Sequence, residues 1–525
     1  MTRTEGPPQS LGKVAARGGA ILGVATATEQ GAQFLRAIIL ARLLSPHDFG
    51  VMGMALVVVF TAEALSQTGL NRAIVQKRGD PSEDLSTVWI LSSLRGVTLY
   101  AIAWVIAPLV AAGFETPEVT SILRWTALAF PIQALVNPAY FTLEREMAFV
   151  RIAWPRLVGV CCDLVVAVAA SLVLRNAWGM VWGFLSGKAV WLVSSYVVRP
   201  WKPDLRLRWD RALELYRYGR HVFRASVVDC IVGQGDRALI GRLTGADSLG
   251  FYSLAARLAS LPSMAGAHIV FRVAFPVFSK VQEDPIRLRK GFHRTLGLFS
   301  TLIVPVSAGL WATAEDLIPA LFGARWAGMI PPFRVLCIAG ACVAFYQLLR
   351  IILSAIGRPD VAARGSYLYL LVFAAPLYPA ILIWGGVGAA WCTLVAGTLA
   401  MGYLFLASQR IIGMTVRGAI GSVIPSLAGG ALMVAVVVSG RAALGFSASV
   451  PWLAAEIVTG AAIYISSVSL LDRLFGAQLA ATILPILRSD GWRATRAAGP
   501  ANAGDGEDAA AGPPGSDPGV ARNAP

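Results

Sequence analysis

The chain is a succession of long apolar runs separated by short polar segments. Fourteen of these runs are close to twenty residues long, and charge, proline or glycine marks their ends. A helix rises about 1.5 Å per residue, so roughly twenty apolar residues cross the ~30 Å hydrocarbon core of a bilayer. The pattern predicts an all-α polytopic membrane protein. The predicted spans are 18–40, 49–70, 85–112, 118–143, 153–174, 178–198, 221–240, 249–271, 295–314, 327–355, 365–384, 389–408, 418–439 and 450–471.

Connecting segments rich in Lys and Arg alternate with segments that are poor in them, and this alternation predicts an orientation in the membrane. With the N-terminus on the cytoplasmic side, the cytoplasmic segments carry 31 Lys and Arg, and the outer loops carry 5. Cationic side chains concentrate in the cytoplasmic loops of membrane proteins. Because the alternation holds from loop to loop, it supports the number of helices and predicts that both termini are cytoplasmic.

Composition agrees with this class and excludes others. Hydrophobic residues make up 56% of the chain, charged residues 14%, and the mean hydropathy is +0.64. The net charge of +15 comes without a compact Lys/Arg run that interleaves aromatics, so nucleic acid is not an expected partner. The six cysteines and four histidines lack metal-ligand spacing, and phosphate-binding and nucleophile motifs are absent from the sequence. We therefore expect a protein that is not an enzyme, with no catalytic residue, metal or cofactor.

An internal repeat divides the chain. Segment 41–55, ARLLSPHDFGVMGMA, returns 200 residues later at 241–255, GRLTGADSLGFYSLA. Each copy follows the first helix of a six-helix block, and an even number gives both blocks the same orientation. This predicts two six-helix lobes, related by a parallel pseudo-two-fold repeat, plus two C-terminal helices. The identical pairs are Arg42/Arg242, Leu43/Leu243, Gly50/Gly250 and Ala55/Ala255.

The predicted organisation has six parts. The linker alternates Trp and Leu with Lys and Arg, which is typical of a segment on an anionic membrane surface, and the C-terminal tail is rich in Ala, Gly and Pro. The parts are a cytoplasmic N-terminal tail (1–17), an N-lobe of helices one to six (18–198), an amphipathic cytoplasmic linker (199–220), a C-lobe of helices seven to twelve (221–408), helices thirteen and fourteen (409–471) and a cytoplasmic, largely disordered tail (472–525).

The repeated segments also carry a family resemblance. The run ARLLSPHDFGVMGMALVVVFTAEALSQTGLNRAIVQ, 41–76, resembles the start of the Wzx-like polysaccharide transporters of the MOP flippase superfamily. The run DRALIGRLTGADSLGFYSLAARLASLP, 236–262, resembles that family's seventh and eighth helices. The resemblance implies a flippase that moves undecaprenyl-pyrophosphate-linked oligosaccharide across the bacterial inner membrane by alternating access, for exopolysaccharide, capsule or O-antigen. Its implied partners are that lipid and the membrane lipids, and they could include the polysaccharide polymerase and chain-length machinery.

Two matched acids lie inside the predicted membrane spans. Glu29 and Asp229 are 200 residues apart, as the repeats are, and seven residues on, Arg36 matches Asp236. A charge at a helix centre costs about 2.5–3.5 kcal/mol, so such groups face a wet cavity, pair with each other or snorkel. Structural ion pairs and a polar cavity both remain open. Because a buried carboxyl can take up a proton, Glu29, Asp229 and Asp236 are candidates for proton or cation coupling.

Cationic residues inside the spans suit an anionic cargo. A pyrophosphate needs Arg or Lys partners in a cleft of low dielectric, and such clefts lie between the lobes near mid-membrane. Arg95, Lys188, Arg257 and Arg334 are the candidates for substrate binding.

Two other functions remain open. A cation-coupled exporter of small molecules, as in the MATE family, shares the two-lobed architecture. A membrane polysaccharide polymerase or glycosyltransferase is the rival from another class. Such an enzyme is expected to have a substantial outer loop with clustered Arg, His or Asp, and the predicted outer loops are short.

Overall fold

The computed structural model describes residues 11–66, 82–204, 209–262, 278–279, 282–444 and 449–475. Side chains at 11–17, 19–20, 82–83, 209–229, 444 and 472–475 lie outside this description. Contacts divide the chain into a unit Met1–Leu471, which holds the two lobes, and a unit Asp472–Pro525, of which only the end of the last helix is described. The described residues form helices and no strand, which confirms the predicted all-α class.

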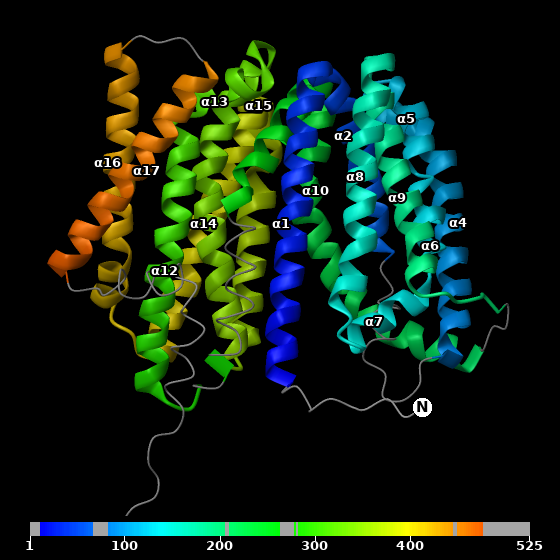
Figure 1. The fold of residues 1–525 in the computed structure, drawn as a ribbon, viewed down its shortest axis with the longest axis horizontal. Coiled ribbons are helices and arrows are strands. Elements are labelled where there is room, and N and C mark those ends of the chain that lie inside the picture. Colours follow the sequence, from blue (N-terminus) through cyan, green and yellow to red (C-terminus); the bar gives the residue numbers. More distant parts are fainter. Residues whose placement is uncertain are drawn as a thin grey trace, which may run out of the picture. The chain divides into compact units, whose positions relative to one another are not determined.

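The N-lobe contains six membrane passages, drawn in blue to cyan-green in Figure 1. Its fourth passage is broken into short pieces. The helices are α1 (Leu11–Leu43), α2 (Pro46–Leu65), α4 (Ser82–Gly113), the broken passage α5 (Glu118–Thr126), α6 (Ala129–Ala134), the 3-10 helix η1 (Pro138–Phe141) and α7 (Thr142–Arg145), then α8 (Phe149–Leu174) and α9 (Trp178–Val198).

The C-lobe and the two appended helices complete the bundle. Gly245 (φ +81°) divides α10 into two passages, and Gly385 (φ +57°) divides α15 in the same way. With each divided helix counted as two, the described helices supply one passage for each of the fourteen predicted spans. The helices are α10 (Trp209–Ala259), α12 (Pro285–Ala312), α13 (Ala314–Phe322), the 3-10 helix η2 (Ala324–Met329), α14 (Ile330–Ala355), α15 (Pro359–Ile412), α16 (Val416–Leu444) and α17 (Val450–Phe475).

Most of the long described helices are apolar enough to cross a membrane. Within the described residues, nine helices are long and apolar enough to cross a membrane, and the bent fourth passage is a tenth. Neither α1 nor α10 is among the nine. For α1 this agrees with its polar side chains Glu29, Gln33 and Arg36, which could not face lipid without cost.

The fourth passage differs from the single helix predicted over 118–143. Its two parts, Glu118–Ala134 and Pro138–Arg145, meet at an angle of 67°. Asn137 holds the break: its side chain accepts a hydrogen bond from the backbone of Ala139 (2.9 Å), and its backbone N–H donates to the hydroxyl of Ser195 on α9 (3.2 Å). Pro138, which follows, cannot donate a backbone bond to continue a helix.

The predicted linker also differs in extent. Residues 199–204 are not helical, but α10 begins at Trp209, so the second half of the predicted linker continues into the first helix of the C-lobe. Residues 205–208 of the linker, the predicted tail from 476 and the N-terminal residues 1–10 lie outside the described residues.

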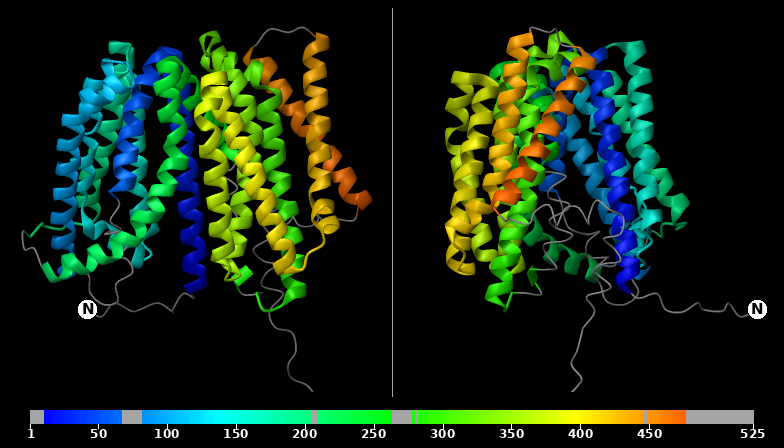
Figure 2. Two further views of the ribbon diagram at one scale, coloured as in Figure 1. Left: turned by 180° about the vertical axis from the view of Figure 1, so that it is seen from behind. Right: turned by 60° about the vertical axis from the view of Figure 1, so that its left-hand side comes forward.

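The two lobes meet where α2 crosses the second half of α10. Figure 1 and Figure 2 show the helices of each lobe side by side, with α16 and α17 at the edge of the C-lobe. At the crossing, a methyl group on Gly50 would overlap the carbonyl oxygen of Ala246, and one on Gly250 would overlap that of Pro46. Pro46 and Ala246 are themselves 200 residues apart. The repeat therefore builds one backbone-to-backbone crossing twice over.

We predict that Gly50→Ala and Gly250→Ala each lower the stability of the protein by about 1–3 kcal/mol, because each added methyl group forces two backbones apart. Thermal unfolding of the detergent-purified protein measures the effect. The matched control is Gly402→Ala on α15, where an added methyl group meets nothing within 4 Å. Equal unfolding temperatures for the crossing variants and the control would contradict the prediction.

Candidate functional site

Two adjoining cavities lie beside α1. The larger, about 420 Å³, lies among α1, α2, α8 and α9 of the N-lobe. The smaller, about 350 Å³, lies between α1 and the end of the second half of α10, and so between the lobes. Glu29, Gln33 and Val160 line both. We call the two together the cleft. Sites for small molecules commonly enclose ~300–1,000 Å³.

Glu29 lies in the cleft, half-buried on α1. Its carboxyl faces the positive field of Arg156 on α8, which lines the same cavity. The structure therefore places this predicted coupling candidate in a cavity, close to a cation.

Arg257 reaches the cleft from the other lobe. Its guanidinium donates a hydrogen bond to the side-chain oxygen of Gln33 on α1. Arg257 is exposed to the cleft, and its neutral partner leaves the cationic charge without a directly bonded carboxylate among the described contacts. Such an arginine has donors available for an anion, and arginine suits phosphate because its donors form a planar fork.

Arg36 forms an ion pair that the sequence patterns did not predict. Its Nε lies 3.1 Å from Oδ1 of Asp163 on α8, and both side chains are largely buried. Two residues from different helices thus neutralise each other in the membrane, which is the structural alternative left open above.

A second polar bridge runs through the N-lobe. The ammonium of Lys188 donates to Gln133 Oε1 at 2.8 Å, and the amide of Gln133 donates in turn to the carboxylate of Glu63. The ammonium lies 5.6 Å and 5.7 Å from the ring centroids of Phe184 and Trp191, within cation–π range. Lys188 therefore lines the cleft between two aromatic faces. Gln133 lies on α6, in the first part of the broken fourth passage.

Other predicted candidates lie apart from the cleft lining. Arg95 on α4 donates to the carbonyl oxygen of Ser66 at the end of α2 (2.9 Å). Arg334 on α14 pairs with Glu315 (2.8 Å) and stacks over Trp311, 5.0 Å from its ring centroid. The same Glu315 also pairs with Arg441 of α16, so Arg334 belongs to a network that joins the C-lobe to the appended helices.

Of the two aspartates predicted for coupling, the structure describes the side chain of Asp236 but not that of Asp229. Asp236 accepts a hydrogen bond from the hydroxyl of Tyr252 (2.6 Å), which joins the two halves of α10 inside the C-lobe. The backbone of Asp229 belongs to α10, but its side chain lies outside the described residues. The cleft thus brings together Glu29, Lys188 and Arg257 of the seven candidates. In the described part of the chain, no three His, Cys, Asp or Glu residues gather as metal ligands.

Two lobes of parallel repeats around a polar cleft form the architecture of secondary transporters. The chain belongs to the family described as "Polysaccharide biosynthesis protein", which it matches over residues 39–331. It is 24% identical to the lipopolysaccharide biosynthesis protein WzxC of Escherichia coli (strain K12), over 70% of this chain and 74% of that protein. It is 28% identical to the succinoglycan biosynthesis transport protein ExoT of Rhizobium meliloti (strain 1021), over 59% of this chain and 63% of that protein.

Among solved structures, the fold resembles that of the lipid II flippase MurJ in an inward closed conformation. The TM-score is 0.70 at 17% sequence identity, over 86% of this chain and 98% of that one. At this identity the likeness concerns the fold. It agrees with the predicted all-helical fold, and the long apolar helices support a multi-pass membrane protein.

We predict that Arg36→Ala destabilises the protein by about 3–5 kcal/mol, because it leaves the Asp163 carboxylate buried without its partner. The double variant Arg36→Ala/Asp163→Ala should recover much of this loss. Thermal unfolding of the wild type, both single variants and the double variant gives the coupling free energy. Strictly additive effects would show that the pair does not interact.

Proposed function

We propose that this protein is a flippase that carries lipid-linked oligosaccharide across the bacterial inner membrane, by alternating access, for polysaccharide assembly. Both termini are cytoplasmic in this proposal, as the loop charges predict. The main support is the interlobe contact of Arg257 with Gln33, which puts an arginine with free bonding capacity beside a polar cleft. The family and the named roles of WzxC and ExoT agree with this cargo.

The charges around the cleft favour an anionic cargo. Cations outnumber carboxylates there, even when the Arg36–Asp163 ion pair is counted as neutral. The remaining side chains are cationic Arg156, Lys188 and Arg257 and anionic Glu29. We propose that Arg257 exchanges Gln33 for a pyrophosphate oxygen, while the oligosaccharide occupies the N-lobe cavity and the lipid tail stays in the bilayer.

This arrangement links binding to movement of the lobes. A pyrophosphate held by Arg257 of the C-lobe and by Lys188 or Arg156 of the N-lobe bridges the two rigid bodies. The relative position of the lobes then depends on the cargo, since a ligand shifts a conformational equilibrium by its different affinity for the two states.

Glu29 is the coupling residue that the structure supports best. It lines both cavities and faces Arg156, so a change in its protonation alters the charge that the cargo meets. We propose Asp229 and Asp236 as secondary candidates. Asp236, with its hydroxyl partner Tyr252, is placed to sense movement between the halves of α10.

The alternative functions receive less support. A MATE-like exporter of cationic molecules would have to bind them in a cleft with surplus positive charge. A polymerase or glycosyltransferase needs catalytic residues on an accessible face, and the described loops between the helices are short. We therefore propose that the protein is not an enzyme. Polymerase and chain-length proteins are its proposed assembly partners.

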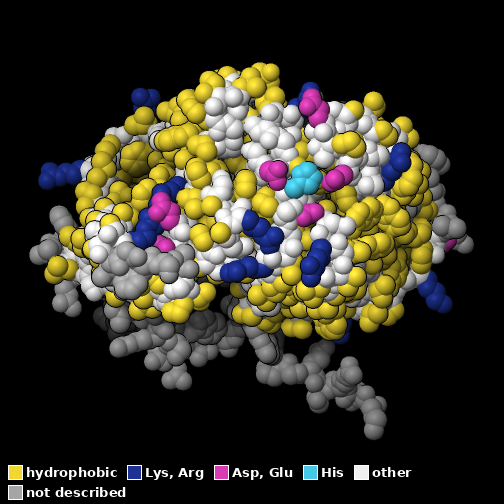
Figure 3. Space-filling model, turned by 90° about the horizontal axis from the view of Figure 1, so that it is seen from above, with side chains coloured by type: hydrophobic (Ala, Val, Ile, Leu, Met, Phe, Trp, Pro, Cys, Tyr) yellow, Lys and Arg dark blue, Asp and Glu magenta, His cyan; other side chains and the backbone are white. Residues whose placement is uncertain are grey.

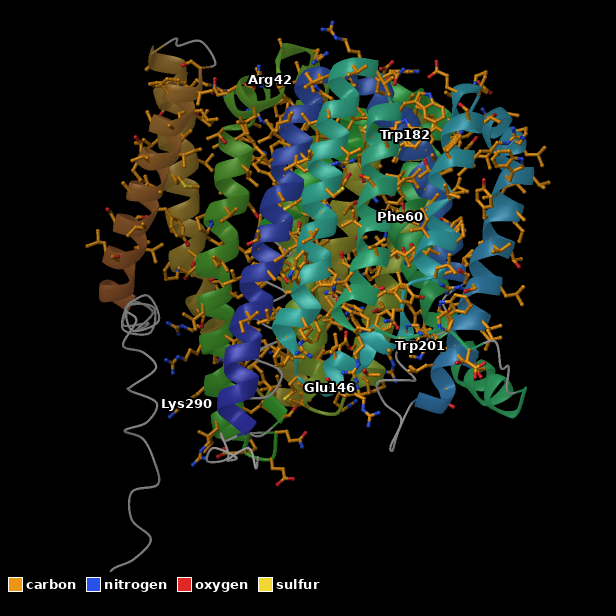
Figure 4. All side chains as sticks on the ribbon, turned by 45° about the vertical axis from the view of Figure 1, so that its right-hand side comes forward. Arg42, Phe60, Glu146, Trp182, Trp201 and Lys290 are labelled. Atoms are coloured by element: carbon orange, nitrogen blue, oxygen red, sulfur yellow. The ribbon has the colours of Figure 1, made fainter. Side chains whose placement is uncertain are left out.

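We predict that deletion of the gene traps lipid-linked oligosaccharide on the cytoplasmic face of the inner membrane, and that Arg257→Glu fails to restore export, with a loss of about tenfold or more in flux. Arg257→Lys should retain part of the flux. The control is Lys290→Glu, an exposed cation at the opposite end of the helices from Arg42 (Figure 4). Accumulation of unpolymerised units on the outer face in the deletion strain would contradict a flippase and support a polymerase.

We predict that Glu29→Gln slows flipping and removes its dependence on the transmembrane proton gradient, because glutamine cannot change its charge. Flux of lipid-linked sugar into inverted vesicles, with and without an uncoupler, measures both effects. Glu144→Gln, an exposed acid on α7, is the control. A Glu29→Gln variant that flips at the wild-type rate and still responds to the uncoupler would exclude Glu29 as the coupling group.

A further inference from the structure

The end of α1 is tied to the opposite lobe. Arg42 is the last residue but one of α1. Its Nε donates to the carbonyl oxygen of Leu321 at 2.7 Å, and its Nη2 donates to the carbonyl oxygen of Ala320. Both acceptors lie in the last turn of α13, in the C-lobe. Carbonyls there lack partners within their own helix and carry the negative end of the helix dipole, so they attract a cation. Arg42 is labelled at this end in Figure 4.

The repeat copy of this arginine makes the reciprocal contact. Nη1 of Arg242, in the C-lobe, lies 2.5 Å from Oε1 of Glu115 in the loop between α4 and α5 of the N-lobe. Each arginine therefore reaches the segment that follows the third passage of the other lobe. The sequence singled out Arg42 and Arg242 only as identical positions of the repeat.

An aromatic contact lies beneath the first arginine. The indole N–H of Trp326, a fully buried residue of η2, donates to the carbonyl oxygen of Ala41 at 2.8 Å. Its ring stands edge-on to Phe49 of the N-lobe and Phe251 of the C-lobe, with centroids 5.0 Å and 5.9 Å away. Figure 3 looks down on this end, where charged side chains gather near the middle and hydrophobic ones at the margins. The lobes are thus joined here by polar contacts above an apolar layer.

From this geometry we infer that Arg42 and Arg242 are two halves of a latch that closes the outer end of the cleft and must release when the cleft opens outward. Arg42 is thirteen residues from Glu29 along α1, or about 20 Å, so the latch lies well away from the cargo site. The inference rests on the proposed alternating-access function. It assigns a conformational role to residues that do not touch the cargo.

The two halves differ in chemistry. The Arg242 and Glu115 side chains are 49% and 74% exposed, so this ion pair is open to screening by salt. Arg42 bonds to neutral carbonyls at a helix end and is reinforced by Arg325, which donates to the carbonyl oxygen of Arg42. The Arg42 half should therefore hold at high salt, whereas the Arg242 half should weaken.

The test is the accessibility of the cleft from outside. A cysteine replaces Val160, which lines both cavities, in a variant without other cysteines. A membrane-impermeant maleimide is then added to spheroplasts, and its labelling rate is measured. We expect Arg42→Ala to raise the rate at least threefold and Arg242→Ala to raise it less. The double variant should approach the product of the two effects.

Matched variants keep the test interpretable. Arg175→Ala, which changes an exposed arginine at the same end of the helices, should leave the rate unchanged. Glu115→Gln should reproduce Arg242→Ala at low salt and lose its effect at high salt, and it removes only an exposed charge. Wild-type labelling rates in both the double variant and Glu115→Gln would overturn the latch.

The labelling does not depend on transport. If the latch variants label faster but the deletion strain shows no trapped lipid-linked sugar, the proposed function fails and the latch stands. If sugar is trapped as predicted but labelling never responds to the variants, the latch fails and the proposed function stands.

Discussion

The contact of two helix backbones at Gly50 and Gly250 is the constraint on which the rest of the structure depends. In a bilayer, apolar side chains gain little by leaving lipid, so close packing of small residues is a main source of helix association. Because α2 and the second half of α10 touch backbone to backbone at one end, the lobes are held together there. Farther along, Gln33 of α1 and Arg257 of α10 meet across the space between the lobes. The turns that begin the two crossing helices differ in chemistry. Ser45 is the N-cap of α2 in one lobe, and Gly245 with positive φ begins the second half of α10 in the other, yet both turns lead to the same close backbone contact.

The cleft is unequal despite the repeat. The N-lobe supplies the larger cavity, with Lys188 set between Phe184 and Trp191, and the C-lobe supplies Arg257. At the matched positions Arg36 and Asp236 the charges are opposite, and each side chain pairs within its own lobe, Arg36 with Asp163 and Asp236 with Tyr252. The repeat is thus matched at the crossing, whereas the described side chains that line the cleft differ between the lobes. An asymmetric cargo, with an anionic group at one end and sugars at the other, requires such a difference between the lobes.

Much of this architecture could be predicted from hydrophobic run length, loop charge and the repeat. Those patterns predicted the fourteen passages and the two lobes, and they singled out Glu29 while leaving open whether it lines a cavity or forms an ion pair. The broken fourth passage escaped because its cause is tertiary: Asn137 bonds to Ser195 on another helix. The ion pair of Arg36 with Asp163 and the bridge through Gln133 were missed for a similar reason, since neither pair is close in sequence. Arg334, a predicted substrate-binding candidate, instead pairs with Glu315, a partner 19 residues away that run length and loop charge do not identify. Apolar runs indicate how deep in the membrane a charged residue lies, but they do not indicate which neighbouring helix it faces.

The central claim is that the cleft moves an anionic lipid-linked sugar from one leaflet to the other. The most direct measurement is translocation by purified protein in liposomes of a fluorescent undecaprenyl-pyrophosphate oligosaccharide, followed by quenching with a reagent that cannot cross the bilayer. The account predicts protein-dependent loss of protection that excess unlabelled lipid-linked oligosaccharide inhibits and that Arg257→Glu abolishes. No translocation by folded protein, or equal translocation by wild type and Arg257→Glu, would contradict it.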